Sequence, residues 1–441
     1  MQQIAPPPYP TFREALAFWL RLGFISFGGP AGQIAIMHDF LVDKKRWISN
    51  SKFLHALNYC MLLPGPEAQQ LATYTGWMLH GARGGLAAGI LFVLPSAFIL
   101  WGLGVLYVTY GQAPAVQAAF DMLKPAVLAI VAGAIVKIGK KSLQTPLHYV
   151  VAALAFVAIY FGDIPFPLII LSAILVGVVA VTFTKLSKFR KRTDDESSLD
   201  TETEYLINRN TAVPHSGFHA GRLIRQIGLA LILWVVPLAV FFTLTAHFDF
   251  WKKLSLFFTQ AAFVTFGGAY AVLPYVAQVS VEKFGWLTRL EMLDGLALGE
   301  TTPGPLIMVL AFVGFMAGYN TFGGSIVAAT VGLATTVFYT FLPSFLFIFA
   351  GAPLIERTHA NPAVKTVLQY ATAAVTGVIL SLCLYLGQAV IMPAGASGVD
   401  VLWMPLVWTL VSLGALQYFK VNMMAWIGVS VGVGLLKYWI I

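Results

Sequence analysis

The stretch Phe24-Ile25-Ser26-Phe27-Gly28-Gly29-Pro30, followed by Trp47 and then Pro64-Gly65-Pro66, decides how this chain folds. A second copy of the pattern holds Phe266-Gly267-Gly268, Trp286 and Pro303-Gly304-Pro305. The differences 266 − 27, 286 − 47 and 303 − 64 all equal 239, and Gly84-Gly85 and Gly323-Gly324 fit the same offset. Because so many Gly, Pro and Trp positions align without a gap, the sequence predicts an internal duplication.

The composition predicts a membrane protein. The chain has 441 residues, of which 58% are hydrophobic and 10% are charged, against roughly 25% charged in soluble domains. No Asp, Glu, Lys or Arg occurs in 84–120, 301–355 or 366–399. These runs exceed the ~20 apolar residues that span a bilayer as a helix, and they are continuous rather than alternating, which disfavours strands. We therefore expect an all-α polytopic membrane protein.

The charged residues and the two cysteines give no indication of nucleic-acid or metal binding. The net charge of +8 comes from Lys and Arg that lie mostly in loops, as the positive-inside rule predicts, so it does not indicate nucleic acid. Cys60 and Cys383 lie in apolar segments with no metal-ligand spacing, so we expect buried thiols. Residues 1–10 form a polar, Pro-rich leader without the features of a cleavable signal peptide.

Four parts are expected along the chain: an N-terminal repeat (11–184), a polar cytoplasmic linker (185–222), an extra spanning helix (223–250) and a C-terminal repeat (251–441). Each repeat begins with two segments broken at Gly-Gly and at Pro-Gly-Pro, because Pro removes a backbone donor and Gly loosens a helix. The first repeat has these at 11–41 and 53–80, and the second at 251–281 and 291–318. Cleaner spans are expected at 85–110, 117–139, 147–161, 164–184, 225–246, 322–350, 363–392, 400–417 and 421–440.

Basic loops set the expected orientation. Lys137, Lys140, Lys141 and the linker are placed in the cytoplasm, which also puts the N-terminus there. The loop Lys44–Arg46 is an exception: either it lies outside, or the broken segments are re-entrant hairpins. Both alternatives stay open, giving about 10–13 membrane segments. Either way an odd number of spans precedes the second copy, so the halves are expected to be inverted repeats.

Matched breaks in inverted repeats indicate the binding site of a secondary transporter. A broken helix leaves backbone groups that cost several kcal/mol each if unpaired in lipid, and helix N-termini hold anions. The alternative is that Gly and Pro serve packing alone. Polar side chains beside the breaks suit a small anion. They are Gln33, Gln69, Gln70, Thr301 and Thr302.

Three charged residues stand out near the breaks. Arg21 either provides a countercharge or snorkels to the membrane interface. Glu67 and Glu300 each lie beside a Pro-Gly-Pro turn, and burial favours the protonated form of a carboxyl group, which suits proton coupling. The alternative is that both carboxylates cap the helix breaks. Asp121 and Lys124, one turn apart, are expected to form a local ion pair or an interfacial feature.

No enzyme signature is convincing. The chain lacks G-x-x-x-x-G-K-[ST] and H-E-x-x-H. Gly428-Val429-Ser430-Val431-Gly432 fits G-x-S-x-G by letter, but it lies inside an apolar span rather than at a strand-to-helix elbow. We expect no enzymatic activity, no cofactor and no metal site.

Three runs of residues resemble the chromate ion transporter family in its long, two-half bacterial form: Phe27-Gly28-Gly29-Pro30-Ala31-Gly32-Gln33, Leu63 to Ala72, and Leu94-Pro95-Ser96. The second-half runs Phe266 to Tyr270 and Thr301 to Pro305 resemble the family's C-terminal half. The resemblance covers nearly the whole chain except the linker. It implies chromate efflux across the bacterial inner membrane, energised by the membrane gradient, with sulfate as the mimicked oxyanion.

The sequence thus predicts a tetrahedral dianion bound between the halves, near the middle of the bilayer. A sulfate or other oxyanion transporter or exchanger is the first alternative; a lipid-carrier flippase or intramembrane enzyme is the second. Whether the protein is a homodimer stays open. The predicted anion-binding residues are Arg21, Gly28, Gly29, Pro30, Gln33, Pro64, Gly65, Pro66, Gln69, Gln70, Gly267, Gly268, Thr301, Thr302, Pro303, Gly304 and Pro305, and the predicted proton-coupling residues are Glu67 and Glu300.

Overall fold

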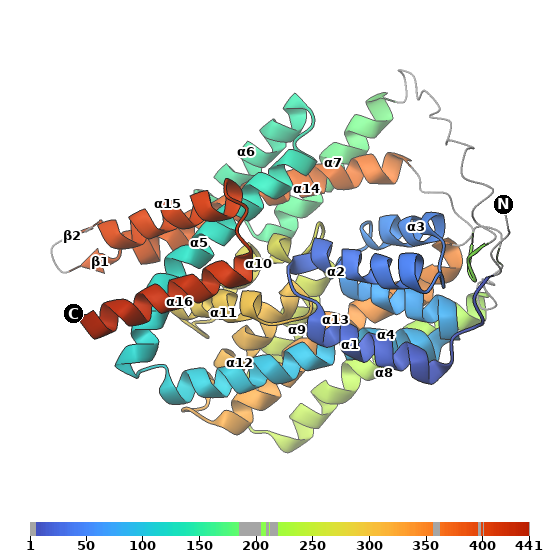
Figure 1. The fold of residues 1–441 in the computed structure, drawn as a ribbon, viewed down its shortest axis with the longest axis horizontal. Coiled ribbons are helices and arrows are strands. Elements are labelled where there is room, and N and C mark those ends of the chain that lie inside the picture. Colours follow the sequence, from blue (N-terminus) through green and yellow to red (C-terminus); the bar gives the residue numbers. More distant parts are fainter. Residues whose placement is uncertain are drawn as a thin grey trace.

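The computed structural model describes residues 6–184, 204–208, 211, 219–355, 362–395, 398–399 and 401–440, and these are mostly helical (Figure 1). The first half comprises α1 (Phe12–Ile25), α2 (Gly29–His38), η1 (Asp39–Lys44), α3 (Asn50–Cys60), α4 (Glu67–Tyr110), α5 (Pro114–Ser142), α6 (Pro146–Tyr160) and α7 (Phe166–Thr184). After α8 (Ala220–Leu244) come α9 (Phe248–Phe263), α10 (Ala269–Gln278), η3 (Val279–Lys283), α11 (Arg289–Thr301), η4 (Leu306–Met308), α12 (Val309–Thr321), α13 (Ile326–Ile355), α14 (Pro362–Ile391), β1 (Ala394–Gly395), β2 (Gly398–Val399), α15 (Trp403–Gln417) and α16 (Met423–Ile440). The expected all-α polytopic fold is confirmed.

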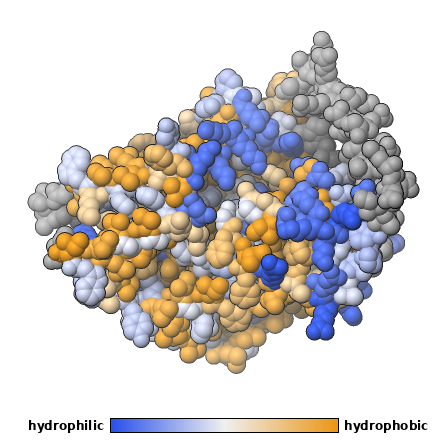
Figure 2. Space-filling model, in the orientation of Figure 1, coloured by the Kyte–Doolittle hydropathy of each residue, from blue (hydrophilic) through white to orange (hydrophobic). Residues whose placement is uncertain are grey.

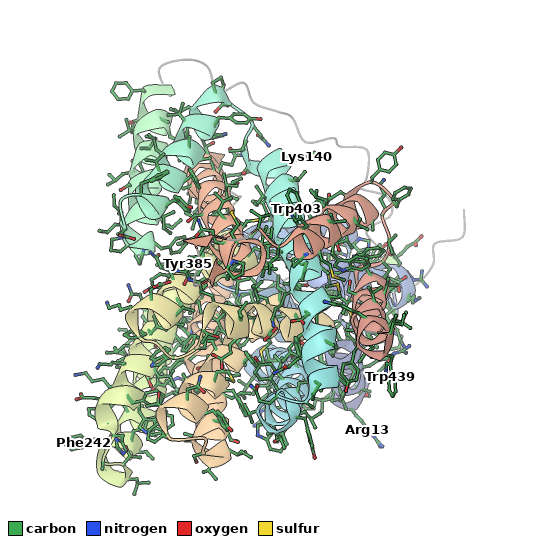
Figure 3. The ribbon with its side chains drawn as sticks, turned by 90° about the vertical axis from the view of Figure 1, so that its left-hand side faces the viewer. Arg13, Lys140, Phe242, Tyr385, Trp403 and Trp439 are labelled. Carbon is green, nitrogen blue, oxygen red and sulfur yellow. The ribbon has the colours of Figure 1, made fainter. Side chains whose placement is uncertain are left out.

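The two halves repeat one order of elements. The series α1, α2, η1, α3 and α4 of the first half is matched by α9, α10, η3, α11 and η4–α13 of the second, and α5–α7 are matched by α14–α16. Helix α8 has no counterpart. It lies at the edge of the molecule, where Figure 3 labels Phe242, and it has no buried residue.

Within the described ranges, seven helices are long and apolar enough to cross a membrane: α4, α5, α7, α8, α13, α14 and α16. Helices α6 and α15 have 15 residues each, about 22 Å of helix, which is short of the ~30 Å hydrocarbon core. The expected full spans at 147–161 and 400–417 are therefore shorter than a bilayer. Figure 2 shows hydrophobic residues over much of the visible surface, as lipid contact requires.

The structure corrects the pairing of Gly84-Gly85 with Gly323-Gly324 in the duplication. Gly323 and Gly324 form the turn between α12 and α13 with φ of +61° and +86°. The corresponding turn in α4 is at His80–Gly81, where Gly81 has φ +61°, and Gly84-Gly85 lie inside the following helical part. The two arms of α4 pack closely there, because a Cβ on Gly76 would lie 2.6 Å from the Gly84 carbonyl oxygen. The halves thus diverge in register after the Pro-Gly-Pro turns.

The broken segments are pairs of short antiparallel helices. At the outer end of the first pair, Lys45 Nζ lies 2.8 Å from Glu14 Oε1, and the Phe18 and Phe40 rings stack at 3.8 Å. The α1 helix therefore returns through α2 and η1 to the face where it began. In the second half Asn320 donates to the Trp286 carbonyl (2.9 Å), which brings the end of α12 back to the start of α11.

The halves interlock through their long helices. Helix α14 packs along α6 and α7 of the first half, while α5 packs along α15 and α16 of the second. The α5 and α14 helices also cross each other, and Ser142 and Thr376 hydroxyls meet there at 2.9 Å. Each half therefore completes the other's bundle.

A short piece of the linker pairs with the loop before α3. Ser49 donates to the Ile207 carbonyl (2.8 Å), Ile207 donates to the Trp47 carbonyl (3.0 Å), and Leu206 donates to the Arg46 carbonyl (3.1 Å). Ile48 and Ile207 are buried partners in a parallel bridge. The loop and this part of the linker therefore share one face, which favours the hairpin alternative for α1–η1. Residues 185–203, 209–210 and 212–218 of the expected linker lie outside the described residues, and its last three residues, 220–222, form the start of α8.

This pairing predicts a disulfide. In a background with Cys60→Ala and Cys383→Ala, Ile48→Cys with Ile207→Cys is expected to form a bond on mild oxidation, because bridge partners meet the Cα distance limits of a disulfide. Mass spectrometry of the linked peptides is the measurement. Ile48→Cys with Leu244→Cys, at the far end of α8, is the control and should stay reduced. Failure of the 48–207 pair to link in folded protein would contradict the shared face.

Candidate functional site

The four helix breaks meet through two reciprocal backbone hydrogen bonds. Gly65 of the first Pro-Gly-Pro donates to the Thr265 carbonyl of the second half (2.8 Å), and Gly304 of the second Pro-Gly-Pro donates to the Ser26 carbonyl of the first half (2.8 Å). Ser26 and Thr265 are themselves 239 residues apart (265 − 26), as are Gly65 and Gly304 (304 − 65). The bonds are therefore a pair related by the duplication, and they place both breaks of each half beside those of the other.

Side-chain caps occur at three outer helix starts and at none of the starts next to the breaks. Thr11, Ser49 and Thr288 accept hydrogen bonds from the first turns of α1, α3 and α11, whereas His247 makes no such cap at the start of α9. Helices α2, α4, α10 and η4 begin at the breaks, where their N-cap residues make no side-chain cap. These residues are Gly28, Pro66, Gly268 and Pro305. Because uncapped N-termini carry free N–H donors and partial positive charge, this centre suits an anion.

Glycine is required by the backbone at these turns. Six of the predicted residues, Gly28, Gly29, Gly65, Gly267, Gly268 and Gly304, have φ between +72° and +123°. Pro30 lies in the first turn of α2, and Pro64, Pro66, Pro303 and Pro305 flank the turn glycines. In this conformation the N–H groups of Gly65 and Gly304 already donate across the halves, so they hold the centre together.

Three predicted glutamines lie at this centre, and each has a side-chain oxygen that accepts no hydrogen bond from the described residues. Gln33 donates through Nε2 to the carbonyls of Gly304 (2.5 Å) and Ser26 (3.3 Å). Gln69 donates to Thr73 (3.1 Å) and Gln70 to the Pro64 carbonyl (2.8 Å). All three side chains are buried, and within the described part of the chain their Oε1 atoms have no hydrogen-bond partner. Buried polar atoms of this kind call for water or a ligand.

Other predicted residues are placed less centrally. Arg21 lies in the last two turns of α1 and is exposed, and it has no hydrogen bond or ion pair to the described residues. The hydroxyls of Thr301 and Thr302 donate to the carbonyls of Leu298 (2.8 Å) and Gly299 (2.9 Å) of their own helix. The threonine protons are thus engaged in the C-terminal turn of α11.

The two acids occupy different environments. Glu300 is 6% exposed and accepts a 2.6 Å hydrogen bond from the hydroxyl of Tyr270 on α10. Glu67 starts α4 and is half-buried. At the 239-residue offset, Glu300 corresponds to Met61 and Glu67 to Leu306, so each acid exists in one half only.

A buried ion pair connects the halves, and the expected pairing of Lys124 with Asp121 is wrong. Lys124 on α5 lies 3.6 Å from Asp294 on α11, and the Tyr107 hydroxyl of α4 donates to the same carboxylate (2.9 Å). The Lys124 and Asp294 side chains are 16% and 6% exposed. The local spacing of Asp121 misled the prediction because the partner comes from a helix 170 residues further along (294 − 124).

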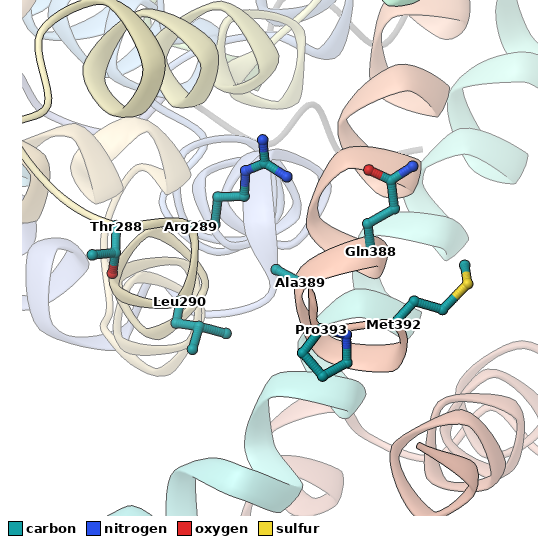
Figure 4. A pocket seen from close by; sticks show the side chains of 7 residues that line it. All are labelled: Thr288, Arg289, Leu290, Gln388, Ala389, Met392 and Pro393. Carbon is teal, nitrogen blue, oxygen red and sulfur yellow. The ribbon is translucent and has the colours of Figure 1, made fainter. Parts of the chain in front are cut away.

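A cavity of about 730 Å³ lies between the start of α11 and the end of α14, away from the helix breaks (Figure 4). Arg289 at its rim binds Glu282 (2.7 Å) and lies over the Tyr385 ring. Hydrogen bonds from Tyr385 and Arg289 hold the pKa of Glu282 below its usual value. This cavity belongs to the outer end of the second half. Within the described residues no group of three or more His, Cys, Asp or Glu is placed to hold a metal.

Fold and site together define a multi-pass helical membrane protein built from two copies of one broken-helix unit. Comparison with known families gives the same division: the chromate transporter model matches residues 13–178 and 251–435. The chain therefore belongs to the chromate transporter family.

Several curated proteins are similar over most of their length. A probable chromate transport protein of Synechococcus elongatus is 30% identical over 87% of this chain and 86% of its own length. Chromate transport proteins of Pseudomonas aeruginosa and Cupriavidus metallidurans are 30% and 28% identical, over 87% and 90% of this chain and 83% and 85% of their own lengths. No solved structure matches the chain.

The turn glycines give a stability prediction. Gly65→Ala and Gly304→Ala are each expected to lower the free energy of unfolding by about 1–3 kcal/mol. Both residues have positive φ, and the new Cβ atoms would lie 2.5 Å from Ser344 Oγ and 2.8 Å from Ser96 Cβ. Thermal unfolding in detergent measures the effect. Gly428→Ala on α16, where a Cβ meets nothing within 4 Å, is the control and should be neutral or slightly stabilising. Equal stability of all three variants would contradict the strain expected from a Cβ atom at Gly65 and Gly304.

The buried ion pair gives a second prediction. Asp294→Asn leaves Lys124 without its partner, so it is expected to cost roughly 3 kcal/mol, whereas Lys124→Met with Asp294→Leu should cost less than Asp294→Asn. Asp121→Asn is the matched control and should change stability by less than about 0.5 kcal/mol. Chemical unfolding of the three variants tests this. A larger loss for Asp121→Asn than for Asp294→Asn would restore the local pairing.

Proposed function

We propose that this protein is a secondary active transporter that exports chromate across the bacterial inner membrane, driven by the proton gradient. The relatives named for chromate transport support the cargo. The observation that carries the proposal is the reciprocal pair of backbone bonds at Gly65 and Gly304, because it gathers four uncapped helix N-termini at one polar centre inside an apolar molecule.

The proposed site lies at this centre. The first-turn N–H groups of α2 and α10, next to Gly28, Gly29, Gly267 and Gly268, provide donors to the anion. The glutamines Gln33, Gln69 and Gln70 lie beside it, and the exposed Arg21 on α1 provides a positive charge for an arriving anion. Such a site consists of neutral donors and one flexible cation. It can bind a dianion and still release it, because no fixed positive charge holds the anion in place.

The proposed topology is an inverted repeat. The short helices of the first half open toward the N-terminus and the linker piece, at the right of Figure 1, and α8 then carries the chain across before the second copy begins. We place the N-terminus and the linker in the cytoplasm, and we retain the four-part division at 184, 222 and 250.

Unequal packing of the two halves supports alternating access. Helix α10 packs against α14, and α11 packs against α5 and α14. Seven consecutive residues of α10, 271–277, are buried, whereas α2 has only Gln33 and Met37 buried. The second half is therefore closed around its breaks, and the first half is open. Exchange of these two arrangements would expose the centre to the opposite side.

Glu300 is the proposed proton carrier. It is buried beside the breaks, its Tyr270 partner is a neutral donor, and the first half has Met61 and Ala31 at the corresponding positions. A single carboxyl group that is neutral in one step and charged in the other would repel the anion only in the charged state. Glu67 is the second candidate.

Sulfate is the main alternative cargo, because it is a tetrahedral dianion of similar size and every group described would bind it. A lipid-carrier flippase or intramembrane enzyme is the alternative from another class. Turnover of a lipid substrate by the purified protein would support that alternative. Competition between chromate and sulfate in a transport assay distinguishes the two oxyanions.

Transport in everted inner-membrane vesicles tests the proposal. Wild-type protein should take up radiolabelled chromate when the vesicle interior is made acidic. The Glu300→Gln variant should lose the gradient-driven part of this uptake while still binding chromate, because an amide cannot take up and release a proton as a carboxyl group does. Glu14→Gln, on the outer end of α1, is the control and should behave as wild type.

Two outcomes would change the assignment. Gradient-driven uptake that survives in Glu300→Gln but is lost in Glu67→Gln would move the proton to Glu67. Absence of uptake by the wild type, with or without the gradient, would reject chromate export in this direction.

A further inference from the structure

A second duplicated motif lies outside the constant offset of the breaks. Leu94-Pro95-Ser96 in the second part of α4 is repeated as Leu342-Pro343-Ser344 in α13, and both 342 − 94 and 344 − 96 equal 248. The offset exceeds 239 in two steps. The turns that precede these helices, at Gly81 and at Gly323, are 242 residues apart (323 − 81), and a further six residues (248 − 242) lie between turn and motif in the second half. Within each helix the proline removes one backbone donor and loosens the helix next to the serine.

Each of these serines lies against the Pro-Gly-Pro turn of the other half. A Cβ built on Gly65 would be 2.5 Å from Ser344 Oγ, and a Cβ built on Gly304 would be 3.1 Å from Ser96 Oγ. The first-half turn thus faces a second-half serine, and the second-half turn faces a first-half serine. This is the same exchange that the backbone bonds of Gly65 and Gly304 make.

Neither serine hydroxyl is used by the protein. Ser96 and Ser344 are 0% and 1% exposed, and in the described part of the chain neither Oγ has a hydrogen-bond partner. Serines in helices ordinarily donate to the carbonyl four residues earlier, as Ser26 and Ser142 do here at 2.6 and 2.9 Å. A buried hydroxyl without a partner costs free energy, and here it occurs at both related positions, each against the Pro-Gly-Pro turn of the other half.

We propose that Ser96 and Ser344 are substrate-binding residues that each donate a hydrogen bond to the transported tetrahedral oxyanion, one from each half. The proposal rests on the proposed function and extends the site to residues beyond the Gly-Gly and Pro-Gly-Pro segments.

The symmetry of the ligand fits this arrangement. A tetrahedral anion has two-fold axes, so a pair of donors related by the duplication can bind two of its oxygens equivalently. Hydroxyl groups are neutral, and they add strong charge-assisted hydrogen bonds to an anion without adding a fixed charge. Glycine at 65 and 304 keeps a Cβ atom away from each hydroxyl, and next to Ser344 the same space is bordered by the Gln70 amide.

The test measures anion binding and stability of the ligand-free protein together. Detergent-purified wild type, Ser96→Ala, Ser344→Ala and the double variant are titrated with sodium chromate and with sodium sulfate by calorimetry, and their ligand-free melting temperatures are recorded. Each single variant should bind about tenfold more weakly, and the double variant about a hundredfold, as expected for loss of hydrogen bonds to a charged group. The ligand-free melting temperature should stay equal or rise, because a buried unpaired hydroxyl is removed.

Ser412→Ala is the matched control. Ser412 on α15 is also fully buried without a partner in the described residues, but it lies outside the breaks. The Ser412→Ala variant should therefore bind both oxyanions with the affinity of the wild type. Wild-type binding that neither Ser96→Ala nor Ser344→Ala weakens would overturn the serine assignment and leave the proposed function intact. Weaker anion binding that is accompanied by a lower melting temperature of the ligand-free variant would show that the serine has a packing role, and this result would also overturn the assignment. Failure of the wild type to bind either oxyanion would instead reject the proposed function.

Discussion

Unpaired backbone groups in hydrocarbon are the constraint on which this structure depends. A helix interrupted inside a membrane leaves N–H and C=O groups that lipid cannot satisfy. Here the interruption in each half is satisfied by the other, through Gly65 to Thr265 and Gly304 to Ser26. Each half completes the breaks of the other, so the contact between the halves supports the fold as well as the site.

The same constraint explains where polar chemistry gathers. Three helices that begin at the outer faces, α1, α3 and α11, are capped by Thr11, Ser49 and Thr288, whereas the helices that begin at the breaks have glycine or proline at the cap position. A capping side chain at an inner end would compete with a ligand for the same donors. Uncapped ends surrounded by buried amide and hydroxyl groups are stable in lipid only with water or a ligand present.

Much of this could be predicted from the sequence, because Gly, Pro and Trp mark backbone geometry directly. The breaks at Gly28-Gly29 and Pro64-Gly65-Pro66 and the all-helical membrane class needed only spacing and composition. The Lys124–Asp294 pair could not be predicted, because its members come from different halves and nothing in the local pattern of Asp121 and Lys124 indicates a distant partner. Ser96 and Ser344 were missed for a related reason: a change of turn position shifts the register, and a search at one fixed offset passes over the repeated Leu-Pro-Ser.

The symmetric backbone carries asymmetric chemistry, and this asymmetry bears on how transport is driven. Lys124 and Asp294 pair across the closed second half, but the corresponding helix of the first half has His55 in place of Asp294 (294 − 239). In the proposed exchange of the two halves, opening the second half separates this buried ion pair. The proposed exchange would therefore carry an electrostatic cost even before a ligand binds, which would bias the empty carrier toward the arrangement described here. An anion that binds both states equally cannot reverse this bias. Protonation of a buried carboxyl group such as Glu300 can, because it changes the charge balance beside α11, the helix that also carries Asp294.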